Sequence, residues 1–247
     1  MPVADLITPD WPVAAHIRAY CSTRHGGVSQ APFDSLNLGT HVGDAPEAVK
    51  QNHRRFKQMA RLPADPLWLT QKHGTTVINS QNWYSGCEAD AIFADIPGHV
   101  CTVLSADCLP VLLCDKAGQQ IAAVHAGWRG LLAGVIENTV RQFRGPHENI
   151  LAWLGPAIGP QQFEVGSEVF QAFTRVDNKA AVAFRQTDAE HYLADIFQLA
   201  RQRLNKTGIT QVSGGDLCTV SDPEHFFSYR RDGQTGRMAT VIWMMPK

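Results

Sequence analysis

The chain has 247 residues, enough for one large domain or two small ones, and a chain of this size buries about three quarters of its unfolded surface. Its 22 basic and 23 acidic residues give a net charge of −1, which offers no electrostatic footprint for DNA, RNA or an anionic membrane. The longest apolar stretches, such as 109–114, are far shorter than the roughly 20 residues that span a bilayer. We therefore expect neither a nucleic-acid nor a membrane partner.

The N-terminus carries Asp5, Asp10 and three prolines where a signal peptide would have a basic start and an unbroken apolar segment. Six cysteines form no C-x-x-C pair, which disfavours a disulfide framework or a structural zinc knuckle. Free thiols in a reducing compartment fit this pattern, so we expect a soluble, cytoplasmic protein. The sequence leaves the oligomeric state open between a monomer and a small homo-oligomer.

The first helix signal covers residues 45–60. Asp44 precedes it with Glu47 three positions on, which is the spacing of a capping box, and Pro46 falls in the first turn, where proline is tolerated. Short runs rich in Val, Leu and Ile then predict three central strands, at 100–105, 109–114 and 120–125.

Apolar residues at helical spacing predict one helix over 131–143, and NILAWLGP (149–156) predicts a further buried strand. Two more helices are expected near 164–174 and 194–206, the second closed by Gly208. The chain ends in the strand-like ATVIWMM. Because no linker or repeat divides it, we expect a single domain over residues 1–247, of the α/β (α+β) class, with a mixed β-sheet core flanked by helices.

Three short segments carry a reactive side chain at the margin of an apolar run: QKHG with His73, SADCLP with Cys108 and AAVHAGWRG with His125. Side chains at strand ends face the rim of a sheet, where α/β proteins commonly build their sites. Two imidazoles and one thiolate suit zinc and leave a fourth position for water or substrate. Spacings of 35 and 17 residues match no local zinc pattern, and the residues taken singly favour a core histidine at position 125 and an inert buried thiol at position 108.

The same residues also suit a Cys-His nucleophilic pair, in which the imidazole lowers the pKa of the thiol. The sequence does not separate a thiolate nucleophile from a thiolate ligand. Asp107, beside Cys108, reads either as the group that orients a histidine or as a turn aspartate.

Seven segments in order resemble the YfiH-like family, whose members have been called laccase-domain proteins, polyphenol oxidases, purine nucleoside phosphorylases and peptidoglycan editing factors. The segments are STRHGGVS, SLNLGTHVGD, QKHG, ADCLPVLL, AAVHAGWRG, LGPAIGPQQFEVG and FFSYRRDGQTGRMA. The resemblance covers nearly the whole chain.

This resemblance implies a single α/β domain of the YfiH-like fold and a zinc site made by His73, Cys108 and His125, which would also be the catalytic residues. The implied activity is phosphorolysis of purine nucleosides (adenosine, guanosine, inosine and methylthioadenosine), together with hydrolytic deamination of adenosine. Zinc with an open position lowers the pKa of a bound water towards about 7, which accounts for deamination. Whether zinc positions phosphate or holds the base during phosphorolysis stays open.

Phosphate needs cationic donors, and the planar fork of arginine suits it. We expect substrate contacts from polar and aromatic residues of the family-like segments and the first helix: Arg24, Asn37, Arg54, Arg129, Tyr229 and Arg230, with Arg231 as an alternative to Arg230 and Trp128 as a further wall of the pocket. Each of these also reads as a surface or packing residue.

Three other functions compete with this one. A four-copper oxidase is disfavoured because the chain has 10 histidines in total and no H-x-H pair, although a His-His-Cys set also takes copper adventitiously. A cysteine amidase acting on cell-wall precursors would use Cys108 as nucleophile and His125 as base, and would survive chelation. A non-enzymatic metal- or nucleotide-binding module would bind nucleosides without turnover.

Overall fold

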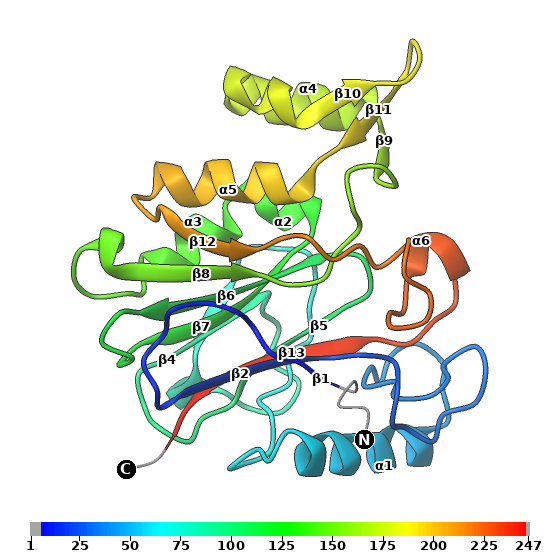
Figure 1. Ribbon diagram of the computed structural model, residues 1–247, viewed down its shortest axis with the longest axis vertical. Coiled ribbons are helices and arrows are strands. Elements are labelled where there is room, and N and C mark those ends of the chain that lie inside the picture. The colour runs from blue at the N-terminus through cyan, green and yellow to red at the C-terminus, as the bar shows by residue number, and fades with distance from the viewer. Residues whose placement is uncertain (1–5, 246–247) are drawn as a thin grey trace.

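Four layers follow one another in the computed structural model, which describes residues 6–245 (Figure 1). Helices α2 (Trp128–Ala133), α3 (Val135–Val140) and α5 (Ile196–Lys206) cover one face of a six-stranded sheet. A four-stranded sheet packs on its other face, and α1 (Pro46–Met59) covers the outer side of that second sheet. The chain is thus a single-domain mixed α/β protein, as the sequence predicts.

The six-stranded sheet has the order β12-β8-β6-β7-β4-β3. Its central neighbours are antiparallel, whereas β12 runs parallel to β8 and β3 parallel to β4. The strands are β3 (Val77–Asn79), β4 (Ala91–Ala94), β6 (Leu109–Asp115), β7 (Ile121–Ala126), β8 (Ile150–Leu154) and β12 (Gln211–Gly214). The centre of this sheet is buried on both faces, which explains the unbroken apolar runs of β6, β7 and β8.

The four-stranded sheet is antiparallel throughout, in the order β1-β2-β13-β5. Its strands are β1 (Leu6–Ile7), β2 (Ile17–Ser22), β5 (Cys101–Ser105) and β13 (Met238–Met244). The predicted strands at 100–105 and 109–114 therefore lie in different sheets. The turn between them passes from one sheet to the other, and this turn carries Cys108.

The alternation of side chains along β7 decides where His125 faces. Ala122 and Val124 pack towards the helices, whereas Ile121 and Ala123 pack between the two sheets. Because successive side chains of a strand point to opposite faces, His125 lies on the inter-sheet side, at the end of that core.

A small module follows β8, at the top of Figure 1. It has a three-stranded antiparallel sheet of β9 (Glu164–Gly166), β10 (Phe184–Gln186) and β11 (His191–Ala194), with α4 (Ser167–Val176) beside it. The remaining elements are α6 (Tyr229–Asp232) and short 3-10 helices at Ser80–Asn82, His147–Asn149 and Asn178–Ala183. Within residues 6–245 no helix is long and apolar enough to cross a membrane.

The structure corrects three sequence expectations. Asp44 does not cap α1: the N-cap is Ala45, and the Asp44 carboxylate accepts hydrogen bonds from Ser29 Oγ (2.6 Å) and Asn37 Nδ2 (2.9 Å) instead. The first part of the predicted 164–174 helix is strand β9. The predicted 131–143 helix is two short helices, because Gly134 between them adopts a left-handed φ of 100°.

Gly134→Ala should destabilise the fold by about 1–2 kcal/mol, because a Cβ finds ordinary contact distances there but disfavours the left-handed backbone. Gly134→Asn should cost less, since asparagine tolerates this conformation. Urea unfolding of the two variants measures the difference. An alanine variant as stable as the wild type would contradict this account of the helix break.

Candidate metal centre

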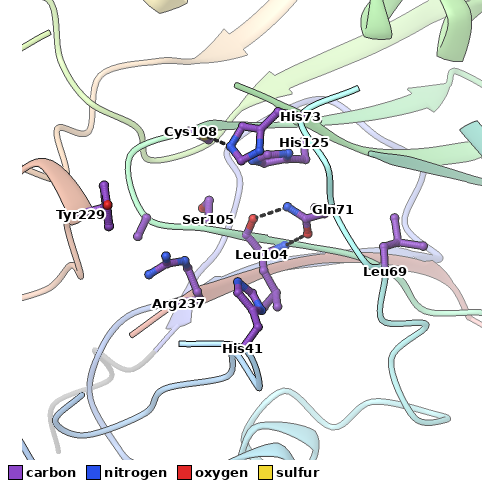
Figure 2. A pocket seen from close by; sticks show the side chains of 11 residues that line it. His41, Leu69, Gln71, His73, Leu104, Ser105, Cys108, His125, Tyr229 and Arg237 are labelled. Carbon is purple, nitrogen blue, oxygen red and sulfur yellow. Dashed lines mark hydrogen bonds between the residues drawn. The ribbon is translucent and has the colours of Figure 1, made fainter. Parts of the chain in front are cut away.

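Two histidines and one cysteine from distant parts of the chain meet at the end of the inter-sheet core. The ligand atoms of His73, Cys108 and His125 lie within 4.8 Å of one another, and Cys108 Sγ is 3.7 Å from His73 Nε2. The imidazole rings stand edge to face with centroids 4.8 Å apart (Figure 2). In the described part of the chain this is the one cluster of three or more His, Cys, Asp or Glu side chains arranged to hold a metal ion.

The buried carboxylate of Asp90, just before β4, fixes two of these side chains. Its Oδ1 accepts hydrogen bonds from His125 Nδ1 (2.8 Å) and from the backbone N–H of His73 (2.9 Å). Its Oδ2 accepts from the N–H of Gly74 (2.7 Å) and Lys72 (3.2 Å). Because an ionised carboxylate only accepts, His125 must donate through Nδ1, which leaves Nε2 as its free ligand atom.

The backbone around His73 has a conformation that depends on these contacts. His73 has a φ of 59°, in the left-handed region that non-glycine residues rarely adopt. Gln71 pins the segment to β5, since its amide donates to Leu104 O (2.8 Å) and accepts from Leu104 N (2.7 Å). The turn is therefore held from both ends.

Asp107 shapes the turn that carries Cys108. It has a φ of 88°, and its carboxylate accepts hydrogen bonds from Thr219 Oγ1 (2.5 Å) and from the backbone N–H of Arg230 (2.7 Å). It ties the turn to the start of α6 and, within residues 6–245, makes no hydrogen bond to a histidine ring. Of the two roles considered for Asp107, the structure favours the turn residue, and Asp90 orients His125.

The charges of the cluster depend on one another. Burial raises the pKa of the Cys108 thiol, but the His125 and His73 rings outweigh it and lower that pKa to about 6. Burial lowers the pKa of His125, but Cys108 and Asp90 raise it to about 9. The metal-free cluster thus favours a thiolate beside an imidazolium. A bound cation would take the place of the imidazolium proton, because metals bind thiolate and neutral imidazole.

Gly127, directly after β7, leaves room beside the cluster. A Cβ at this position would lie 3.0 Å from both Cys108 Sγ and His73 Cδ2. Glycine thus lets the chain turn from β7 into α2 without displacing either side chain.

The cluster opens into a cavity of about 410 Å³, within the range of about 300–1,000 Å³ typical of small-molecule sites. Besides the cluster, its polar lining comes from His41, Gln71, Ser105, Tyr229 and Arg237 (Figure 2). One end of the cavity therefore carries the side chains that suit a metal ion, and another part carries the Arg237 guanidinium.

The structure brings one of the predicted substrate-binding residues to this cavity. Tyr229 lines it and is 61 % exposed. Arg24 instead pairs with the Asp34 carboxylate (3.3 Å) and lies over the Phe227 ring. Asn37 is fully buried, and its amide bonds to neighbouring backbone groups.

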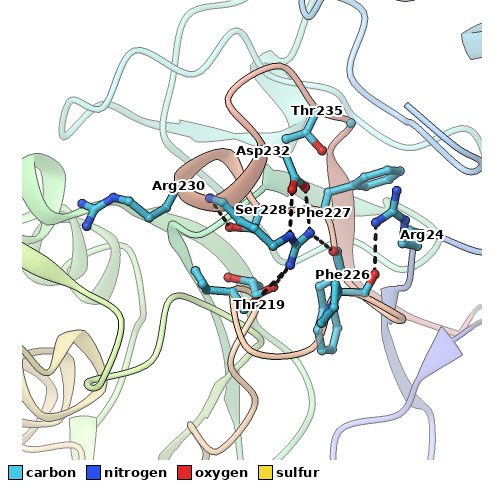
Figure 3. A network of polar contacts seen from close by, with 12 residues as sticks. Arg24, Thr219, Phe226, Phe227, Ser228, Arg230, Asp232 and Thr235 are labelled. Atoms are coloured by element: carbon cyan, nitrogen blue, oxygen red, sulfur yellow. Dashed lines mark hydrogen bonds and ion pairs between the residues drawn. The ribbon is translucent and has the colours of Figure 1, made fainter. Parts of the chain in front are cut away.

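The other predicted residues do not line the cavity. Arg54 is exposed on α1, and Arg129 lies over the Trp128 ring, 4.3 Å from its centroid. Arg230 extends away from α6 and donates to Glu164 O (2.9 Å) (Figure 3).

Arg231 ties the loop before α6 to that helix. It donates to the carbonyls of Thr219, Val220 and Phe226 and pairs with Asp232 (2.8 Å). These contacts give Arg231 a structural role.

Five residues of the site were not predicted from the sequence: Asp90, Gln71, His41, Ser105 and Arg237. Four of them lie within segments quoted above: Gln71 in QKHG, Ser105 in SADCLP, His41 in SLNLGTHVGD and Arg237 in the segment ending GRMA. Their position within these segments is the one feature of the sequence that could have indicated them. Asp90 lies in none of the quoted segments.

Comparison with known proteins identifies the family of this chain. A family model described as "Multi-copper polyphenol oxidoreductase laccase" matches residues 18–245. The chain belongs to this family, the YfiH-like or laccase-domain family.

Two relatives are named "Purine nucleoside phosphorylase YfiH". The one from Shigella flexneri is 55 % identical over 244 residues, which is 98 % of this chain and 100 % of the relative. The one from Escherichia coli (strain K12) is 54 % identical with the same coverage. The crystal structure of Neisseria meningitidis protein NMB0706 superposes with a TM-score of 0.95 at 47 % identity, covering 98 % of this chain and 100 % of that one. The YfiH-like fold predicted from the sequence is confirmed.

Asp90→Asn should weaken zinc binding by about 10- to 100-fold, the usual cost of losing the partner that orients a metal-binding histidine. The single amide oxygen cannot accept both from the His125 ring and from the Gly74 and Lys72 N–H groups, so the variant no longer fixes the His125 tautomer with a free Nε2. Competition with a chromogenic chelator measures the change in affinity.

Asp188→Asn is the matched control, because Asp188 also pairs with a histidine, His191 (2.9 Å), but on the exposed surface. It should leave zinc affinity unchanged. Equal zinc affinity in Asp90→Asn and wild type would show that Asp90 does not support the site.

Proposed function

We propose that this protein is a zinc-dependent purine nucleoside phosphorylase that also deaminates adenosine. The observation that carries the proposal is the His73–Cys108–His125 cluster opening into a cavity of small-molecule size. The names of relatives more than 50 % identical over nearly the whole chain support the phosphorylase part. The deaminase part, the zinc ion and the substrates adenosine, guanosine, inosine and methylthioadenosine rest on the family resemblance and on the chemistry of the donors.

The donor set fits zinc. Two imidazole nitrogens and one thiolate are borderline-soft ligands, and three protein ligands leave a coordination position open, as in catalytic rather than structural sites. His73 Nε2, Cys108 Sγ and His125 Nε2 would hold the ion. When bound, zinc supplies Lewis-acid chemistry and lowers the pKa of water in its open position.

The residues of the chain provide positioning. Asp90 holds His125 in one tautomer and orientation, and Gln71 holds the turn of His73 against β5. The β-sheets behind the cluster exclude water from its inner side, since His125 is only 3 % exposed. Tyr229 stands at the open side, where its ring could lie against a purine.

A thiol-dependent amidase is the second candidate, because Cys108 Sγ lies beside two imidazole rings, 3.7 Å from His73 Nε2. The metal-free cluster supports a Cys108 thiolate beside a protonated His125, the state that a nucleophilic cysteine needs. Metal dependence separates the two functions: chelation abolishes a zinc reaction and spares a thiol hydrolase. A four-copper oxidase finds less support, since residues 6–245 contain one three-ligand cluster of this kind.

The test incubates metal-analysed protein with adenosine, with and without phosphate, and resolves adenine, inosine and hypoxanthine. Adenine should form only with phosphate, and inosine in both arms. Cys108→Ala should lower the rates of phosphorolysis and of deamination more than about 100-fold, because it removes a metal ligand. Loss of a residue that only orients a ligand already lowers metal affinity or activity about 10- to 100-fold.

Cys218→Ala is the matched control. Cys218 is also a partly exposed free cysteine, but its Sγ accepts from Gly159 N (3.2 Å) and does not line the cavity. It should keep full activity. Zinc-loaded wild-type protein that forms no product in either arm would refute the proposed function.

A further inference from the structure

The cation at the far side of the cavity is Arg237, the residue before β13. Its guanidinium lies across the cavity from His73 and His125, with the His41 ring next to it (Figure 2). Among the arginines of the described chain, it is the one that lines this cavity. Its backbone is held by another part of the chain than the three cluster residues.

The backbone of Arg237 is clamped by the segment 37–39. Its N–H donates to Asn37 Oδ1 (3.0 Å), and its carbonyl accepts from Leu38 N (3.1 Å). Gly39 makes the close approach possible, because a Cβ there would come within 2.8 Å of Arg237 Cγ. The same segment continues to His41, so one loop positions both residues.

The guanidinium keeps donors free for a ligand. Nη1 donates to the carbonyls of Thr235 and Gly236, at 2.9 Å each. Among the described residues, neither Nε nor Nη2 has a hydrogen-bond partner, and no carboxylate pairs with Arg237. Burial lowers the pKa of Arg237, which marks a cation with incomplete solvation. The charges of Cys108 and Asp107 offset this effect in part, but neither side chain is hydrogen-bonded to the guanidinium, so the half-buried cation favours an anion beside it.

Ser105 supplies a second unsatisfied group in the same cavity. It is 2 % exposed, and its Oγ has no hydrogen-bond partner. Ser105 pairs with Met238 across β5 and β13, which places it next to Arg237. Buried hydroxyls without a partner are rare in native proteins, so a ligand atom is expected near this oxygen.

We propose that Arg237, Ser105 and His41 form the subsite for inorganic phosphate, an inference that rests on the phosphorylase activity proposed above. Arginine offers its two free donors to two phosphate oxygens, and Ser105 Oγ–H and the His41 ring N–H offer one each. In the reaction, an oxygen of hydrogen phosphate forms a bond to C1′ of the ribose while the bond from C1′ to the purine nitrogen breaks. The purine leaves with that electron pair and takes up the proton that hydrogen phosphate loses, which gives ribose 1-phosphate and the free base.

The test compares Arg237→Gln with the wild type by steady-state phosphorolysis of inosine, varying inorganic phosphate and nucleoside separately. Loss of a charge-assisted contact should raise the KM for phosphate about 10- to 100-fold. The KM for inosine and the rate of adenosine deamination without phosphate should change less than threefold. Arg237→Lys should recover part of the loss, because it keeps the charge but not the fork.

Two further variants complete the set. Ser105→Ala, which removes one hydroxyl, should raise the KM for phosphate by about five- to tenfold. Arg175→Gln, on the exposed end of α4 and far from the cavity, should change nothing. Direct titration of each zinc-loaded variant with inorganic phosphate, monitored by calorimetry, should show the same order of affinities.

The outcomes separate this inference from the proposed function. If the wild-type protein catalyses no phosphorolysis, the proposed function is refuted. Titration with inorganic phosphate still tests the subsite in that case: equal affinity for phosphate in Arg237→Gln and wild type overturns the proposed subsite. Active variants with an unchanged KM for phosphate overturn the subsite alone. The same titration with adenosine 5′-monophosphate gives a further outcome. If Arg237→Gln lowers the affinity for adenosine 5′-monophosphate more than the affinity for inorganic phosphate, the guanidinium binds a phosphate carried by the substrate, and the proposed subsite for inorganic phosphate is overturned.

Discussion

The site depends on the hydrogen bonds that the Asp90 carboxylate accepts from His125 and from the turn that carries His73. Burial raises the pKa of Asp90, but hydrogen bonds from His125 and from the Gly74 and Lys72 N–H groups outweigh it, so the carboxyl stays ionised. One side chain thereby joins β7, which carries His125, to the turn that carries His73. A carboxylate with four hydrogen bonds is costly to leave unpaired, so the turn and the strand hold each other in place.

The two-sheet architecture explains why the cavity lies where it does. Between the sheets the core is mostly apolar, and polar side chains meet at one end, where His125 lies next to the last residue of β7 and Ser105 ends β5. The turn that carries Cys108 crosses between the sheets at this end, and Arg237 enters β13 beside it. The fold thus places the His73–Cys108–His125 cluster and a fixed guanidinium on one cavity.

The sequence predicted α1 and the strands β5 to β8 well, because their apolar patterns are long and bounded by turn residues. It could not show that Gly134 divides a helix, since a lone glycine in an apolar repeat is compatible with either outcome. It drew attention to the three cluster residues through segments at strand ends. Asp90 was not predicted, because nothing in its local sequence distinguishes it from a turn aspartate. Arg237 was not predicted, because its free hydrogen-bond donors are a property of tertiary packing.

The most direct test of the central claim is zinc K-edge X-ray absorption of the protein as purified. The account predicts one zinc per chain with one sulfur at about 2.3 Å and two imidazole nitrogens at about 2.0–2.1 Å, leaving room for a light-atom ligand. A zinc shell of nitrogen and oxygen alone, or protein that stays free of zinc when the ion is supplied, would contradict it.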